Sequence, residues 1–61
     1  MKLEFEHLDG HYMMTINDEN LLSVCVPVGG QWVPIFEREV EEYLDLGDCY
    51  QVALDMIEES Q

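Results

Sequence analysis

The chain has 61 residues, of which fourteen are acidic and only two, Lys2 and Arg38, are basic, so its formal net charge is −12. Hydrophobic residues make up 48% of the chain, too large a share for an acidic disordered tail. We therefore expect residues 1–61 to form a single small acidic domain with one core and a low net stability.

The first residues, MKLEFEHLDGHYMM, lack the apolar segment of a secretory signal, and no run approaches the ~20 apolar residues of a membrane span. Cys25 and Cys49 lie in unrelated contexts, whereas a small secreted fold usually carries more cysteines. These features predict a cytoplasmic protein with reduced core thiols. A zinc site that joins the cysteines to His7 and His11 is less favoured, because the spacing matches no zinc motif.

The segment EFEHLDGHYMMTI predicts a β-hairpin, because Asp9-Gly10 is a preferred centre for a two-residue turn with positive φ. Alternation along the strands separates a core face from an outer face, and Glu4 and Glu6 lie on the outer face about 6.6 Å apart. The expected core face contains Leu3, Phe5, His7, Tyr12, Met14 and Ile16. The expected cross-strand pairs are Leu3 with Ile16, Phe5 with Met14, His7 with Tyr12 and Leu8 with His11.

A second hairpin is predicted from LLSVCVPV and QWVPIF, joined by a turn at Gly29-Gly30. Pro27 and Pro34 cannot donate hydrogen bonds to a sheet, so part of this hairpin should be an edge or be irregular. A phosphate-binding loop at the two glycines is not favoured, because neither GxxxxGK[ST] nor GxGxxG surrounds them.

After Pro34 the apolar spacing changes to about 3.6 residues, which predicts a helix that ends at Gly47. Its apolar stripe would contain Phe36, Val40, Tyr43 and Leu44.

A second helix is predicted from Asp48, which would cap its N-terminus, with Gln51 at the reciprocal capping position. Its buried stripe would contain Cys49, Val52, Ala53, Met56 and Ile57. The expected fold is therefore α+β: two antiparallel β-hairpins form a small sheet, and two short C-terminal α-helices pack on one face of it.

The acids are concentrated in the predicted helical half, since residues 36–61 carry a net charge of −8 and residues 1–35 a net charge of −4. In the first helix Glu37, Glu41 and Asp45 would repeat every four residues, which costs roughly 0.2–0.5 kcal/mol per pair. Neutralising Glu41 and Asp45 should therefore stabilise the domain. Because a net charge of about 2–8 already suffices for solubility, the excess predicts a surface that attracts a cationic partner.

Five carboxylates on a first helix of about eleven residues give one charge per ~3.3 Å, close to the ~3.4 Å per phosphate of one DNA strand. In size, charge and helix-borne carboxylates over the whole chain, the protein resembles the small acidic DNA-mimic inhibitors that phages and other mobile elements make against host defence, including anti-CRISPR and anti-restriction proteins. The resemblance implies a partner with a Lys/Arg-rich nucleic-acid-binding groove, such as a Cas effector subunit of a CRISPR surveillance complex.

We expect this surface to act in a monomer, without a cofactor, a metal or a membrane, and without binding nucleic acid, because both are polyanions. The predicted partner-binding residues are the acids of the helical half together with two acids of the first strand: Glu37, Glu39, Glu41, Glu42, Asp45, Asp48, Asp55, Glu58, Glu59, Glu4 and Glu6.

An alternative is a small interaction module that binds a host protein through apolar surface, with charge serving solubility. The chain contains aromatic anchors of the kind found in interface hot spots, namely Trp32, Phe36 and Tyr43. In so small a domain these side chains also suit the core. Enzymatic activity is not expected, because His7 and His11 flank the first turn on opposite faces and no nucleophile accompanies them. The residues NDEN lack the ligand alternation of a calcium loop.

Overall fold

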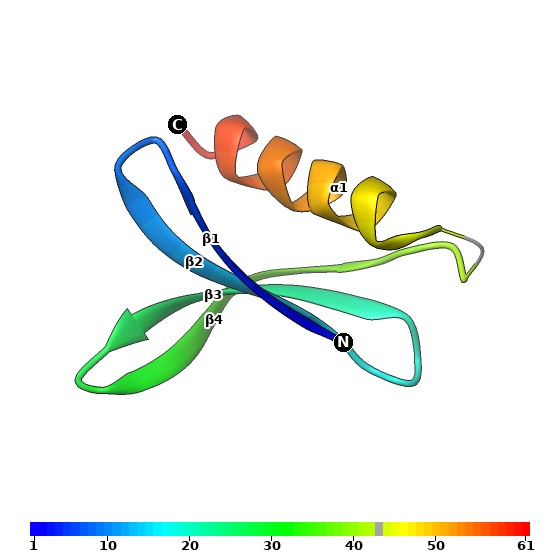
Figure 1. Cartoon of the computed structure of the whole chain (residues 1–61), viewed down its shortest axis with the longest axis horizontal. Coiled ribbons are helices and arrows are strands. Elements are labelled where there is room, and N and C mark those ends of the chain that lie inside the picture. Colours follow the sequence, from blue (N-terminus) through cyan, green and yellow to red (C-terminus); the bar gives the residue numbers. More distant parts are fainter. Residues whose placement is uncertain (43) are drawn as a thin grey trace.

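The computed structural model describes residues 1–42 and 44–61, which form a four-stranded antiparallel sheet with a helix packed on one face (Figure 1). Strands β1 (Lys2–His7), β2 (Gly10–Ile16), β3 (Leu21–Val28) and β4 (Gln31–Glu39) lie in chain order across the sheet. Helix α1 (Leu46–Glu59) follows β4. Within the described ranges, no helix has the length and apolar character needed to cross a membrane.

The predicted α+β fold with two C-terminal helices is wrong, because the described residues contain one helix and are mostly sheet. The segment predicted as the first helix instead continues β4 as far as Glu39, and Gly47, predicted to end that helix, lies in the first turn of α1. Tyr43, which belonged to the predicted stripe, lies outside the described residues.

Residues 36–39 form part of a strand because β3 needs a hydrogen-bonding partner along its whole length. Phe36 and Val40 are spaced by four, as on a helix, but an even spacing also keeps two residues on one face of an extended chain. Unpaired backbone groups in β3 would carry a desolvation cost, and β4 satisfies them by placing Phe36 opposite Val24 and Arg38 opposite Leu22. The pairing thus overrides the helical spacing.

The first hairpin turns at Leu8 and Asp9, whose φ values are 51° and 65°, one residue earlier than predicted. Gly10 instead lies in β2, where an added Cβ would come within 2.7 Å of the Tyr12 ring. The absence of a side chain at Gly10 therefore leaves room for this ring, and the glycine is not a turn residue.

This turn changes the register of the first hairpin by two residues. Leu3 lies opposite Met14 instead of Ile16, and Phe5 lies opposite Tyr12 instead of Met14. Because side chains alternate with a period of two, the shift leaves each side chain on its predicted face. The predicted pairs are wrong, whereas the predicted division between core face and outer face is retained.

The second hairpin turns at Gly29 and Gly30, both with positive φ, as predicted. Near its middle the register shifts between Val24 and Cys25, and Ile35 is the extra residue of β4 beside Pro34. The irregularity agrees with the expectation drawn from the prolines, which cannot donate to a neighbouring strand.

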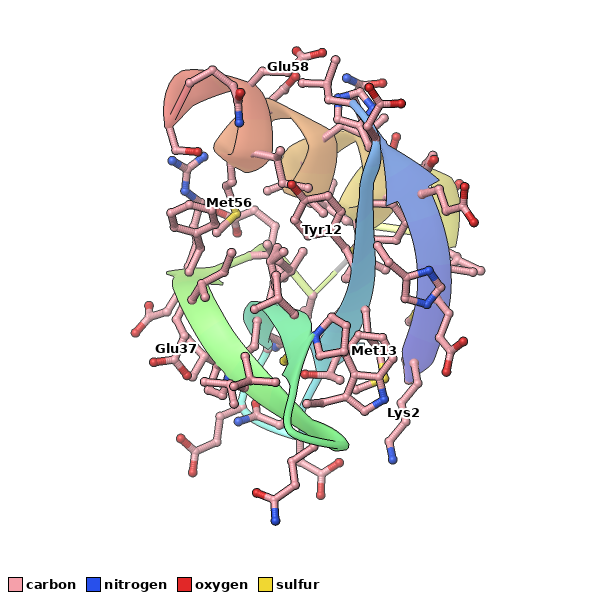
Figure 2. All side chains as sticks on the ribbon, turned by 90° about the vertical axis from the view of Figure 1, so that its left-hand side faces the viewer. Lys2, Tyr12, Met13, Glu37, Met56 and Glu58 are labelled. Atoms are coloured by element: carbon pink, nitrogen blue, oxygen red, sulfur yellow. The ribbon has the colours of Figure 1, made fainter. Side chains whose placement is uncertain are left out.

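The main core lies between the sheet and α1. Phe5 stacks on Tyr12 at 5.7 Å and meets the edge of Tyr50 at 5.1 Å, which ties β1 and β2 to the helix. Figure 2 shows Met56 and Tyr12 in the layer between helix and sheet. The buried residues of this core are Met14, Leu22 and Val24 from the sheet and Cys49, Ala53, Met56 and Ile57 from α1. The helix buries its predicted stripe, with Val52 partly exposed at the edge.

Helix α1 begins one turn earlier than predicted, because Asp45 and not Asp48 caps its N-terminus. The Asp45 side chain accepts a hydrogen bond from the Asp48 backbone N–H at 2.8 Å. At the other end, the Ser60 hydroxyl donates to the Ile57 carbonyl at 2.7 Å. The last turn contains two acids and no basic residue, so its negative end is not compensated from within the helix.

Substituting Leu8 should stabilise the protein. A leucine with φ near 51° is in the left-handed region, which costs a residue with a Cβ roughly 1–2 kcal/mol, whereas asparagine tolerates this region well. We expect Leu8→Asn to raise the free energy of unfolding in urea by about 1 kcal/mol. Leu46→Asn, at an exposed leucine without positive φ, is the control. Lower stability of Leu8→Asn would contradict the assignment of strain to this turn.

Asp45 should stabilise the fold despite the excess of negative charge. We expect Asp45→Ala to lower the free energy of unfolding by about 1 kcal/mol, because the cap of α1 is lost, and Asp45→Asn to retain most of it. Glu42→Ala removes a nearby exposed charge without removing a cap and is the control. If charge repulsion dominated, as expected for the predicted first helix, Asp45→Ala would instead melt at a higher temperature.

Candidate protein-binding surfaces

The predicted partner-binding acids fall into three separate groups. A far-face group lies on the sheet face away from α1, a loop group lies between β4 and α1, and a helix group lies on α1. All eleven residues are exposed. The far-face group is Glu4, Glu6, Glu37 and Glu39; the loop group is Glu41, Glu42 and Asp45; and the helix group is Asp48, Asp55, Glu58 and Glu59.

The structure does not bring Glu37, Glu41 and Asp45 together on a helical stripe. Glu37 lies in β4, Glu41 follows that strand, and Asp45 is the helix cap. The predicted density of one carboxylate per ~3.3 Å therefore does not occur, because these residues do not form a helix. The four acids of α1, a helix of 14 residues, instead give about one carboxylate per 5 Å of axis.

On the far face, several carboxylates contact neighbouring polar side chains. Glu37 Oε2 accepts a hydrogen bond from the Ser23 hydroxyl at 3.3 Å. His11 lies between two glutamates, with Nε2 at 3.8 Å from Glu4 Oε2 and Nδ1 at 4.0 Å from Glu6 Oε1. These acids therefore border the open face of the sheet at both edge strands, β1 and β4.

A small apolar cluster occupies the centre of the same face. Met13 lies opposite Cys25 across β2 and β3, and only 8% and 6% of these residues are exposed. Trp32 is half-buried and stacks on His11 at 5.5 Å. Figure 2 shows Met13 on the part of the sheet that lies away from the helix. We call Met13, Cys25, Trp32 and His11 the far-face cluster.

Sequence reasoning missed the far-face cluster. Alternation placed Met13 on the outer face, which is where it lies, but gave no reason to expect its burial. The signal was the sequence QWVP after the second turn, because β4 returns beside β3 and brings Trp32 opposite Pro27. Phe36, the other described aromatic anchor, is half-buried and packs against the main core.

The end of α1 is joined to both edge strands by ionisable side chains. His7 Nε2 lies 3.3 Å from Glu58 Oε1, although this buried nitrogen lacks hydrogen-bond geometry toward any partner among residues 1–42 and 44–61. Arg38 donates to Glu59 Oε2 at 3.5 Å. Both carboxylates are more than half exposed, so solvent screens these contacts and each contributes little to stability.

The cysteines lie on opposite faces of the sheet, Cys25 in the far-face cluster and Cys49 in the main core, and both are free thiols. Burial raises the pKa of the Cys25 thiol, and the negative charge of Glu37 raises it further. Burial, with smaller contributions from Asp48 and Asp45, likewise raises the pKa of Cys49. Neither thiol is activated as a nucleophile. In the described part of the chain, no three His, Cys, Asp or Glu side chains gather as metal ligands.

The raised thiol pKa values predict a loss of stability at alkaline pH. Both states keep their thiols protonated well below the ordinary value of 9.0. As the pH rises through this value, the unfolded chain loses its protons first, so the free energy of unfolding should fall from about pH 9 upward. Urea unfolding at several pH values measures this slope, and Cys25→Ala and Cys49→Ala should each reduce it.

The same burial predicts that both thiols of the folded protein react slowly with a disulfide reagent at pH 8, and rapidly in urea. Fast reaction of the folded protein would contradict the burial of these side chains.

No protein-family model, curated protein or solved structure shows significant similarity to this chain.

Proposed function

We propose that the protein is an acidic inhibitor that binds the cationic nucleic-acid-binding groove of a host defence effector and so excludes nucleic acid from it. Its place of action would be the cytoplasm of a cell infected by a phage or carrying another mobile element. The single observation that supports this proposal best is the exposed side of α1, which presents four carboxylates from a helix without lysine or arginine. An anionic surface of this kind attracts Lys/Arg-rich grooves over a distance.

The spacing of three helix acids is compatible with contacts normally made by phosphates. Three helix acids project in a band about 40° wide along α1: Asp48, Asp55 and Glu59. The rise along the axis is about 10.5 Å from Asp48 to Asp55 and about 6 Å from Asp55 to Glu59. These intervals are close to three and two phosphate rises of ~3.4 Å along one DNA strand. The geometry supports replacement of some phosphates, at a lower charge density than the sequence predicted.

A contact of this kind should depend strongly on ionic strength. Exposed carboxylates are screened with a Debye length of about 10 Å at 0.1 M salt, so the attraction weakens as salt is added. The protein itself should remain unbound to nucleic acid at every salt concentration, since both carry high negative charge.

The alternative function, a module that binds a host protein through apolar surface, is favoured by one specific observation. Residues 20–36, which include all of β3 and the first part of β4, contain no charged residue. In a chain with a net charge of −12, such a segment suits an apolar contact that varies little with salt. The salt dependence of binding therefore separates the two functions.

Competition with DNA tests the inhibitor proposal. The immobilised protein is exposed to nuclease-treated bacterial lysate at low salt, and bound proteins are eluted with short duplex DNA. We expect nucleic-acid-binding proteins to be retained and displaced by the duplex. The triple variant Asp48→Asn/Asp55→Asn/Glu59→Gln should retain at least about tenfold less of these nucleic-acid-binding proteins.

The control has the same net charge. Asp9→Asn/Asp18→Asn/Glu19→Gln removes the same three charges from the turns of the sheet and should change retention little. Melting temperatures of both triple variants exclude unfolding as the cause. Captured proteins that duplex DNA fails to displace, or equal loss in both variants, would contradict the proposal.

A further inference from the structure

The β3–β4 hairpin projects from the body of the molecule and leaves apolar side chains uncovered. Figure 1 shows its tip extending away from α1. Val24 belongs to the core under the helix, so Val26 and Val28, at alternate positions of β3, lie on the same face. Val33 lies opposite Val26 and shares this face.

Exposure increases along this face because α1 does not reach the hairpin tip. Val28, Val33 and Ile35 are 58%, 39% and 43% exposed, and Val26 is half-buried. These three are half of the exposed large hydrophobic residues in the described part of the chain. We call Val26, Val28, Val33 and Ile35 the hairpin strip.

The hairpin strip leads into a groove between β4 and the C-terminal end of α1. Ile35 belongs to both features, Phe36 and Met56 provide apolar walls, and the volume is about 410 Å³. Arg38 and Glu59, which lie 3.5 Å apart, also line it. The strip and the groove therefore adjoin at Ile35, and the charged groups of the groove lie at the end away from the hairpin tip.

The charges at that end favour a cation from a partner. Two acids line the groove, Glu37 and Glu59, and Glu59 lies in the last turn of α1, where the helix has its negative end and no basic residue of its own. Arg38 offsets only one of these carboxylates. A second copy of this chain is a poor occupant, because it would bring another net charge of −12 to the same surface.

We propose that the hairpin strip and the groove dock an amphipathic segment of a basic protein, with its apolar side chains on Ile35, Phe36 and Met56 and its Lys/Arg side chains beside Glu37 and Glu59. The inference rests on the proposed function only in taking the partner to be cationic. Apolar contact supplies affinity and position, and the acids supply attraction and orientation.

An amphipathic helical peptide made of leucine and lysine is a suitable probe. Titrated into the isotope-labelled full chain, it should shift the NMR signals of residues in the hairpin strip and groove. A peptide with serine in place of leucine keeps the charge and should lose these shifts, and a peptide with glutamine in place of lysine should bind more weakly.

Matched substitutions locate the contact. Ile35→Ser should weaken binding of the leucine–lysine peptide about tenfold, since it removes an apolar side chain from the contact. Leu46→Ser alters a residue of nearly equal exposure, 44% against 43%, at the opposite end of α1 and should leave affinity unchanged. Unchanged melting temperatures would show that neither variant acts by unfolding the domain.

The docking site is overturned if Leu46→Ser weakens binding as much as Ile35→Ser, if the serine peptide binds equally well, or if the shifts centre on the far-face cluster. Failure of the inhibitor proposal has a different signature. If duplex DNA does not displace captured proteins while the leucine–lysine peptide still occupies the groove, the DNA-mimic function is lost and the docking site is retained.

Discussion

A single helix packs against a four-stranded sheet, and this limits how much of the sheet can be buried. Helix α1 covers the centre of one face, where Met14, Leu22 and Val24 are fully buried. The opposite face has no such cover among the described residues, and the β3–β4 hairpin extends beyond the helix. The far-face cluster, the uncovered hairpin strip and the separation of the acids all follow from this arrangement.

The same arrangement reduces the repulsion expected from the net charge. A continuous acidic helix would hold like charges at four-residue spacing, each pair costing roughly 0.2–0.5 kcal/mol. The fold instead distributes the carboxylates over two sheet edges, a loop and α1. It also gives some of them partners: Asp45 caps the helix, Glu37 contacts Ser23, and Glu59 contacts Arg38. A domain with a small core therefore tolerates its charge.

Charge and apolar surface are segregated in a way that suits binding to a basic protein. The uncharged segment 20–36 forms the projecting hairpin, while the acids surround it on the edges of the sheet and on the helix. Long-range attraction and short-range apolar contact are thus carried by different parts of one small domain. In protein complexes, charge of this kind mainly raises the association rate, whereas well-packed apolar contacts slow dissociation.

The sequence alone determined the features that depend on neighbouring residues: two hairpins with their turns near Gly10 and at Gly29-Gly30, the faces of the strands, and the buried stripe of the last helix. Tertiary structure decided the rest. Residues 36–39 became a strand because β3 required a partner, and the first hairpin turned at Leu8 and Asp9, which places Gly10 in β2. Which acids share a surface was likewise invisible in the sequence, since it depends on where each strand and the helix lie. Local spacing cannot report a backbone hydrogen bond made by residues that meet only after the chain has folded.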